Sequence, residues 1–120
     1  MAQDFQDLVV WQRAMEMTVS VYRSTRSFPR EEMYGLTSQM RRAAVSVASN
    51  IAEGRGRLTQ GEFRQFLGLA QGSNCELQTQ ILVAKQLEIG NPELLIEAQK
   101  LSIEVAKMLS ALIASVGSAS

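Results

Sequence analysis

Apolar residues recur every three or four positions along most of the chain, which is the period of an amphipathic α-helix. Four such stretches predict helices over about residues 7–28, 37–53, 59–89 and 92–116, and no stretch shows the alternation that is typical of a strand. The apolar stripe expected on the first helix contains Leu8, Trp11, Met15, Thr18, Tyr22 and Thr25. The pattern therefore predicts an all-α protein.

Capping residues and glycines mark the boundaries between these helices. Thr59 and Glu62 have the spacing of a capping box, in which two side chains satisfy backbone N–H groups that the start of a helix leaves unpaired. Asn91 followed by Pro92 is a start signal for the fourth helix. Gly54 is expected to end the second helix, because glycine readily adopts the left-handed conformation that closes many helices.

The composition indicates one folded domain. Hydrophobic residues make up 46% and charged residues 20% of the chain, as in globular proteins. Short connections favour antiparallel neighbours, so we expect residues 1–120 to form a single antiparallel, up-down-up-down four-helix bundle. No apolar run approaches the ~20 residues that span a bilayer, and the first residues lack the features of a signal peptide. We therefore expect a cytoplasmic protein with no membrane partner.

Most catalytic chemistry lacks its usual residues. The chain contains no histidine, the most frequent general base and metal ligand. Cys75, the one cysteine, has no neighbouring base and is expected to be a small buried hydrophobe rather than a nucleophile. A catalytic carboxylate pair formed by Glu53 and Glu76 is the alternative, which the absence of histidine disfavours. We expect no enzyme activity, no catalytic residues, no metal and no cofactor.

A polar stripe lies beside the apolar face of the second helix. It contains Arg42, Ser46, Ser49, Asn50 and Glu53, and the third helix places Ser73, Asn74 and Glu76 within an otherwise apolar stretch. Polar groups of the two helices are expected to meet in a buried network that favours one register. The residues proposed for this structural network are Arg42, Asn50, Glu53 and Glu76. A solvated helix face would produce a similar pattern.

Arginine is confined to the first half of the chain. The 12 basic and 12 acidic residues balance, but residues 1–64 hold nine arginines and no lysine, whereas residues 65–120 hold three lysines and no arginine. Guanidinium groups bind phosphate oxygens in pairs, so two arginine clusters are candidates for nucleic-acid binding. They are Arg23, Arg26 and Arg30, and Arg55, Arg57 and Arg64. The alternative is that they pair with Glu16, Glu31, Glu32, Glu53 and Glu62.

Three segments carry a family resemblance: DLVVWQRAMEMTVSVYRSTRSFP, YGLTSQMRRAAVSVASNIAEGRGR and EFRQFLGLAQGSNCELQTQILVA. Over about residues 5–88 the chain closely resembles the bacterial four helix bundle protein family, known from intervening sequences of large-subunit ribosomal RNA genes. The resemblance implies a homopentameric ring of four-helix bundles with no known enzyme activity. The residues at motif positions, interpreted as determinants of fold and assembly, are Arg41, Arg42, Asn50, Glu53, Gly54, Arg57 and Glu76.

The resemblance also implies partners. A related branch, the accessory variability determinant proteins of diversity-generating retroelements, binds nucleic acid and a reverse transcriptase through a positively charged pentamer. We therefore expect self-association and binding of RNA, DNA or a protein such as a reverse transcriptase. The alternative is a pentameric protein-interaction scaffold without nucleic-acid binding. Ring formation would cover apolar residues left outside the bundle stripes, for which the candidates are Val10, Val19, Val21, Val45, Leu69 and Ile103.

Overall fold

Four helices make up most of residues 4–117, the part of the chain that the computed structural model describes. They are α1 (Val9–Thr25), α2 (Leu36–Arg55), α3 (Gln60–Gln86) and α4 (Pro92–Gly117). Two short 3-10 helices, η1 (Phe5–Asp7) and η2 (Arg30–Glu32), precede α1 and α2. Within the described residues there is no strand, which confirms the all-α prediction. No helix in this range is long and apolar enough to cross a membrane.

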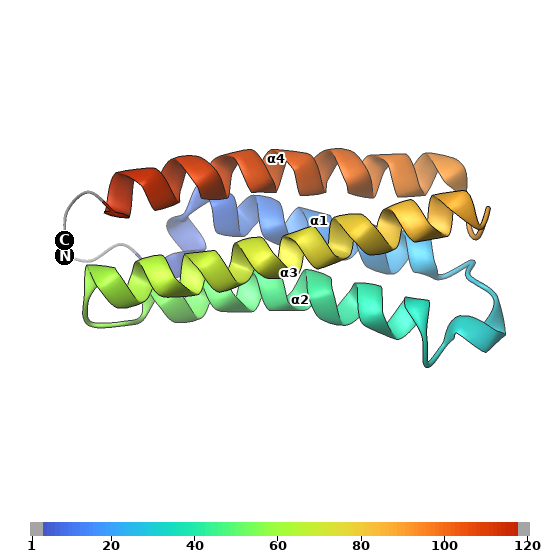
Figure 1. Ribbon diagram of the computed structural model, residues 1–120, viewed down its shortest axis with the longest axis horizontal. Helices are drawn as coiled ribbons and strands as arrows, with labels where there is room; N and C mark the ends of the chain where they lie inside the picture. Colours follow the sequence, from blue (N-terminus) through green and yellow to red (C-terminus); the bar gives the residue numbers. More distant parts are fainter. Residues whose placement is uncertain (1–3, 118–120) are drawn as a thin grey trace.

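The helices lie side by side along the long axis of a bundle that measures 46 × 20 × 20 Å (Figure 1). Helix α1 packs on α2 and α4, and α3 packs on the same two helices from the other side. The α1–α2 and α3–α4 connections lie at one end, which we call the connection end (Figure 1). The α2–α3 turn lies at the opposite end, which we call the turn end (Figure 1).

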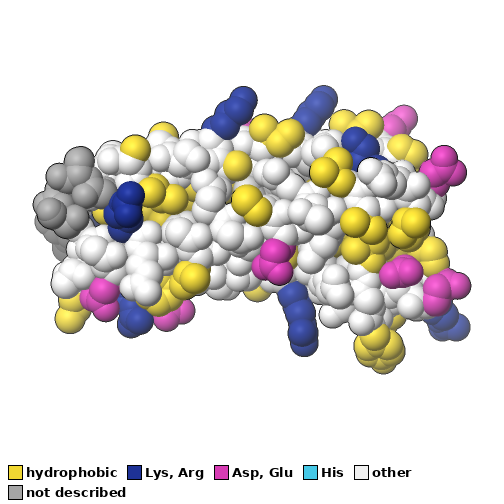
Figure 2. Space-filling model, viewed as in Figure 1, with side chains coloured by type: hydrophobic (Ala, Val, Ile, Leu, Met, Phe, Trp, Pro, Cys, Tyr) yellow, Lys and Arg dark blue, Asp and Glu magenta, His cyan; other side chains and the backbone are white. Residues whose placement is uncertain are grey.

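The buried side of α1 differs from the predicted stripe. Its buried residues are Val10, Ala14, Met17, Ser20, Val21, Ser24 and Thr25. Met15 and Tyr22, which the stripe assigns to the core, are 39% and 40% exposed. The prediction is wrong for these two residues because the buried face of α1 follows Ala14, Met17 and Val21, a series of three- and four-residue steps that starts one position earlier than Met15. Hydrophobic side chains also remain on the face of the bundle seen in Figure 2.

Gly54 lies inside α2 and does not end it, contrary to the prediction. The helix continues to Arg55, and the N–H group of Gly56 caps it by donating to carbonyl groups of the last turn. A Cβ atom on Gly54 would lie 2.7 Å from Cβ of Phe66 and 3.1 Å from Cδ1 of Phe63. The missing side chain therefore lets α3 pack directly against the backbone of α2.

The N-cap signals at the starts of α3 and α4 are confirmed, but the second bond of the capping box, from the Thr59 N–H to the Glu62 carboxylate, is not formed. Thr59 Oγ1 accepts a hydrogen bond of 3.1 Å from the backbone N–H of Glu62 and donates one of 3.2 Å to the Glu62 carboxylate. Asn91 Oδ1 accepts from the backbone N–H groups of Glu93 and Leu94. Both helices consequently begin where the sequence indicates.

Helix α3 ends at Gln86, before the predicted residue 89. Glu88 adopts a φ of 57°, in the left-handed region, and the N–H of Ile89 donates to the carbonyl of Ala84 at 3.0 Å. This closing bond satisfies a carbonyl group of the last turn, so the chain leaves the helix early. Gly90 also has a positive φ of 79° and packs so closely on Phe28 that an added Cβ would lie 2.6 Å from its ring.

We predict that Gly54→Ala destabilises the protein by about 1–3 kcal/mol, because the new methyl group overlaps Cβ of Phe66, which cannot rotate away. The matched control is Gly72→Ala in α3, where an added Cβ meets nothing within 4 Å. That variant should gain roughly 0.5–1 kcal/mol from its higher helix propensity. Urea unfolding followed by circular dichroism measures both. Equal stability of the two variants would contradict the close contact at Gly54.

Candidate functional site

A polar cluster joins α2 to α3 on the side of the predicted network. The hydroxyl oxygens of Ser46 and Ser73 lie 2.8 Å apart, and Asn50 Nδ2 donates to the Ser46 carbonyl at 2.8 Å and to its hydroxyl at 3.0 Å. All three side chains are half-buried. Polar groups of the two helices therefore meet, as the sequence indicates.

A second polar cluster lies between α3 and α4, and its two side chains are fully buried. Asn74 Nδ2 donates to the carbonyl of Ser102 at 2.9 Å, and the Ser102 hydroxyl donates to Asn74 Oδ1 at 2.7 Å. The sequence placed Asn74 opposite α2, but the side chain reaches α4. Because each buried polar group here has a partner, the pair favours a single register of α3 on α4.

The other members of the predicted network make no bond to either cluster, although Arg42 and Glu76 line a groove together with Ser46 and Ser73. Arg42, Glu53 and Glu76 are exposed, and their side chains make no hydrogen bond or ion pair with any residue in the range 4–117. Of the four residues proposed for the network, only Asn50 joins one. Within the same range, no three Asp, Glu or Cys side chains are grouped in a way that could hold a metal ion.

The two arginine clusters lie at opposite ends of the bundle. Arg23 belongs to the end of α1 and Arg26 and Arg30 to the α1–α2 connection, so the first cluster lies at the connection end. The second, Arg55, Arg57 and Arg64, surrounds the α2–α3 turn. One subunit therefore presents two separate basic sites, one at each end of its 46 Å length, rather than a single continuous basic surface.

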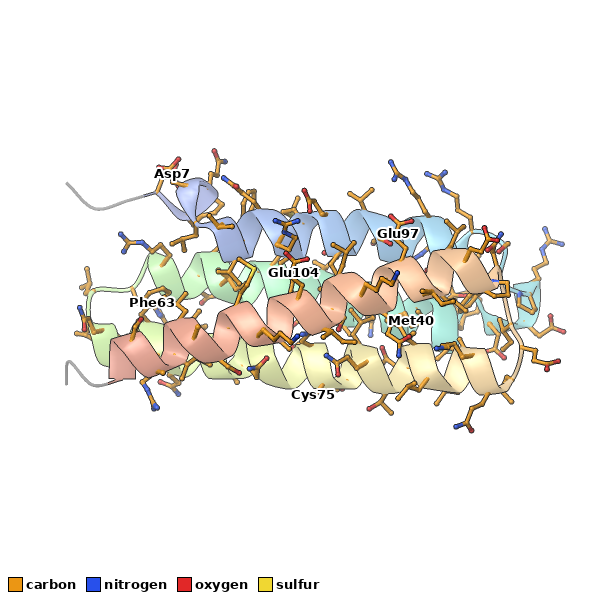
Figure 3. The ribbon with its side chains drawn as sticks, turned by 90° about the horizontal axis from the view of Figure 1, so that it is seen from above. Asp7, Met40, Phe63, Cys75, Glu97 and Glu104 are labelled. Atoms are coloured by element: carbon orange, nitrogen blue, oxygen red, sulfur yellow. The ribbon has the colours of Figure 1, made fainter. Side chains whose placement is uncertain are left out.

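Glutamates do not neutralise these clusters within the subunit. Both ion pairs found in residues 4–117 belong to Arg13, which lies 3.2 Å from Glu16 and 3.3 Å from Glu104. Glu104 lies on the neighbouring helix α4 and is labelled in Figure 3. The alternative in which the six arginines pair with glutamates therefore does not hold for the described residues. Their guanidinium groups keep N–H donors available for another partner.

Aromatic rings position part of the second cluster. The Arg55 guanidinium lies 5.9 Å from the ring centroid of Phe63, and that of Arg57 lies 4.7 Å from the ring centroid of Phe66. Contacts of this kind hold a guanidinium group over the ring face and leave its edges able to donate hydrogen bonds. The close packing at Gly54 thus also fixes the base of the arginine cluster.

An exposed groove between α1 and α2 combines aromatic and basic side chains that the sequence did not connect. Arg41 Nε donates to Thr25 Oγ1 at 2.9 Å, and its guanidinium carbon lies 4.7 Å from the ring centroid of Tyr22. Tyr34 also lines the groove. Sequence reasoning missed this site because it assigned Tyr22 to the core and Arg41 to fold and assembly. The YGLTSQMRR segment, with an aromatic residue just before the start of α2 and paired arginines in that helix, carries the signal.

Cys75 is exposed on α3, so the prediction of a buried thiol is wrong (Figure 3). The residue directly follows the buried Asn74, and the helical turn of about 100° per residue carries its side chain to the solvent side. Its free thiol has no basic partner among the described residues that could activate it.

The family model of the 23S rRNA-intervening sequence protein matches residues 6–111, which is most of the chain. The chain belongs to this family. The segments quoted above therefore identified the family correctly. A comparison of this intervening-sequence protein with curated proteins gives no match.

A solved structure shares the fold of this intervening-sequence protein. It is the crystal structure of a protein of unknown function from the S23 ribosomal protein family of Bacteroides thetaiotaomicron. The TM-score is 0.78, and the alignment covers 88% of this chain and 98% of that chain at 20% sequence identity. At this identity the similarity establishes the common fold alone.

We predict that Ser102→Ala destabilises the intervening-sequence protein by about 1–3 kcal/mol, because Asn74 Oδ1 is left buried without a donor. Glu76→Gln is the control, since this exposed side chain makes no polar contact in residues 4–117, and it should change stability by less than about 0.5 kcal/mol. Thermal or urea unfolding compares the two. A larger loss for Glu76→Gln than for Ser102→Ala would contradict the observed partition of the polar residues.

Proposed function

We propose that this protein is a non-enzymatic accessory protein that binds RNA or a nucleoprotein. The observation that supports the proposal is that six arginines form two clusters and none of the six has an ion-pair partner within residues 4–117. Unpaired guanidinium groups on a surface attract phosphate and bind its oxygens in pairs.

The proposed functional unit is a homopentameric ring of up-down-up-down bundles. Apolar side chains that a neighbouring copy could cover remain on each helix: Val19, Val45, Leu69 and Ile103 are between 41% and 50% exposed. Val10 and Val21, predicted for the same surface, are buried in the core, so the prediction is wrong for these two. A ring with its bundles parallel to the axis would carry five copies of each arginine cluster on its two rims, which multiplies the local positive charge.

A protein-interaction scaffold is the second candidate. The formal net charge of the chain is zero, which favours neither attraction nor repulsion of nucleic acid at long range. In this case the ring presents neutral or acidic surfaces to a protein, for example a reverse transcriptase, and binds no nucleic acid. A pull-down that recovers a protein partner equally well with and without nuclease treatment would favour this function.

The RNA-binding proposal predicts a steep dependence of affinity on salt. Filter binding to structured RNA and to duplex DNA should weaken by roughly 10³-fold between about 50 and 200 mM salt if six phosphates are contacted. Replacing all three arginines of either cluster by Gln should reduce the slope of log K against log[salt] by roughly 3.

The control for this measurement replaces Lys85, Lys100 and Lys107 by Gln, which removes the same charge from α3 and α4. It is compared with the variant of the second cluster, because Lys100 lines a groove with Arg23 of the first. The lysine variant should keep most of the slope. The proposal is contradicted if the native protein shows no salt-dependent binding, or if the lysine and arginine variants lose affinity equally.

The ring predicts a molar mass of about 66 kDa by light scattering, for five copies of the 13.2 kDa chain. Leu69→Glu and Ile103→Glu should each lower the mass, because a carboxylate placed in an apolar contact is desolvated without a partner. Leu58→Glu, at an exposed position of the α2–α3 turn, is the control and should keep the native mass. A native mass near that of one chain would rule out the ring.

A further inference from the structure

The groove between α1 and the start of α2 brings together two tyrosines and two arginines that do not belong to either arginine cluster. It has a volume of about 630 Å³, within the ~300–1,000 Å³ range of pockets that bind small ligands. Its lining includes Tyr22, Met33, Tyr34, Ser38, Arg41 and Arg42. We call it the tyrosine groove.

Tyr34 has almost no contact with the rest of the subunit. It is 96% exposed, and the preceding Met33 is 50% exposed. Aromatic rings normally bury most of their area, because their exposure to water is unfavourable. Tyr34 therefore contributes nothing to the bundle core and offers a flat ring to a partner that can stack on it.

The charge of the groove selects an anionic partner. Arg41 and Arg42 line it, and no acidic residue does. Arg41 is held by Thr25 and lies over Tyr22, whereas Arg42 is exposed and has no hydrogen bond or ion pair within residues 4–117. Among the acids that precede the groove in sequence, Glu32 directs its carboxylate to the N–H of Leu36 at the start of α2.

From these observations we infer that the tyrosine groove binds the unpaired bases of a single-stranded RNA segment, with Tyr34 stacking on a base and Arg42 binding a phosphate. The inference rests on the RNA-binding function proposed above and names the form of RNA. Aromatic side chains bind single strands because the faces of unpaired bases are accessible, whereas a duplex hides them. Phosphate contacts on their own do not require an exposed aromatic ring.

The position of the groove supports a continuous path for such a strand. The α1–α2 connection carries Arg26 and Arg30 and leads directly to Met33 and Tyr34. The groove and the first arginine cluster therefore lie at the same end of the bundle (Figure 1). Val45, which is proposed above for the contact between copies, also lines the groove, so a neighbouring copy is the alternative occupant. A copy that covered Arg42 with apolar side chains would leave its charge without a partner, which favours RNA.

The test compares binding of a fluorescein-labelled oligouridine of about 12 nucleotides with binding of an RNA duplex of the same length, by fluorescence anisotropy. Tyr34→Ala should weaken binding of the single strand by roughly tenfold and leave duplex binding within about twofold. Tyr34→Phe retains the ring and should keep the native affinity. Leu58→Ala is the matched control, because Leu58 is 97% exposed but lies at the α2–α3 turn.

The outcomes separate this inference from the proposed function. If Tyr34→Ala binds the single strand as tightly as the native protein, the inference that the tyrosine groove binds unpaired bases is wrong. Salt-dependent binding of the duplex in the same experiment would still support phosphate binding by the arginine clusters. Absence of binding to either RNA overturns both. Light scattering of Tyr34→Ala completes the test: a lower molar mass than the native protein identifies the groove as a contact between copies and overturns the inference.

Discussion

The narrow interior of the bundle is the constraint on which the rest of the structure depends. Small residues occupy the buried faces of all four helices: Ala14, Ala43, Ala44, Ala48, Gly54, Ala70, Ala84 and Ala98. With these residues inward, helix backbones approach closely, and larger side chains such as Met17 and Met40 fill the space that remains. Tyr22 and Met15 lie outside the buried face of α1 and remain at the surface. The same packing that forms a tight core creates the exposed apolar and aromatic surface from which the proposed interactions derive.

Local signals in the sequence predicted the starts of α3 and α4, because a capping side chain acts within three residues of its target. Features that depend on a distant partner could not be predicted in this way. Gly54 is a residue type that often ends a helix. Only the position of Phe66 across the α2–α3 interface shows that the role of Gly54 is close packing. Likewise, the hydrophobicity of Tyr22 suggests burial, whereas the neighbouring Val21 occupies the side of α1 that faces the core.

The candidate site also has features that the local sequence predicts and features that depend on distant partners. Residue type and position were enough to identify the arginine clusters, since they follow from helix ends that the sequence marks. Whether those arginines have glutamate partners depends on three-dimensional distances and could not be predicted. The Asn74–Ser102 pair was missed because it links residues that are 28 positions apart on helices that the polar pattern did not connect.

The scarcity of ion pairs means that salt can act on binding without acting on folding. Only Arg13 forms such pairs in residues 4–117, and ion pairs at an exposed surface contribute little to stability. Added sodium chloride also weakens the repulsion between neighbouring arginines, since charges are screened beyond about 10 Å at 0.1 M. Ionic strength can therefore be used to release a bound polyanion from an intact bundle, so elution at high salt would return folded protein.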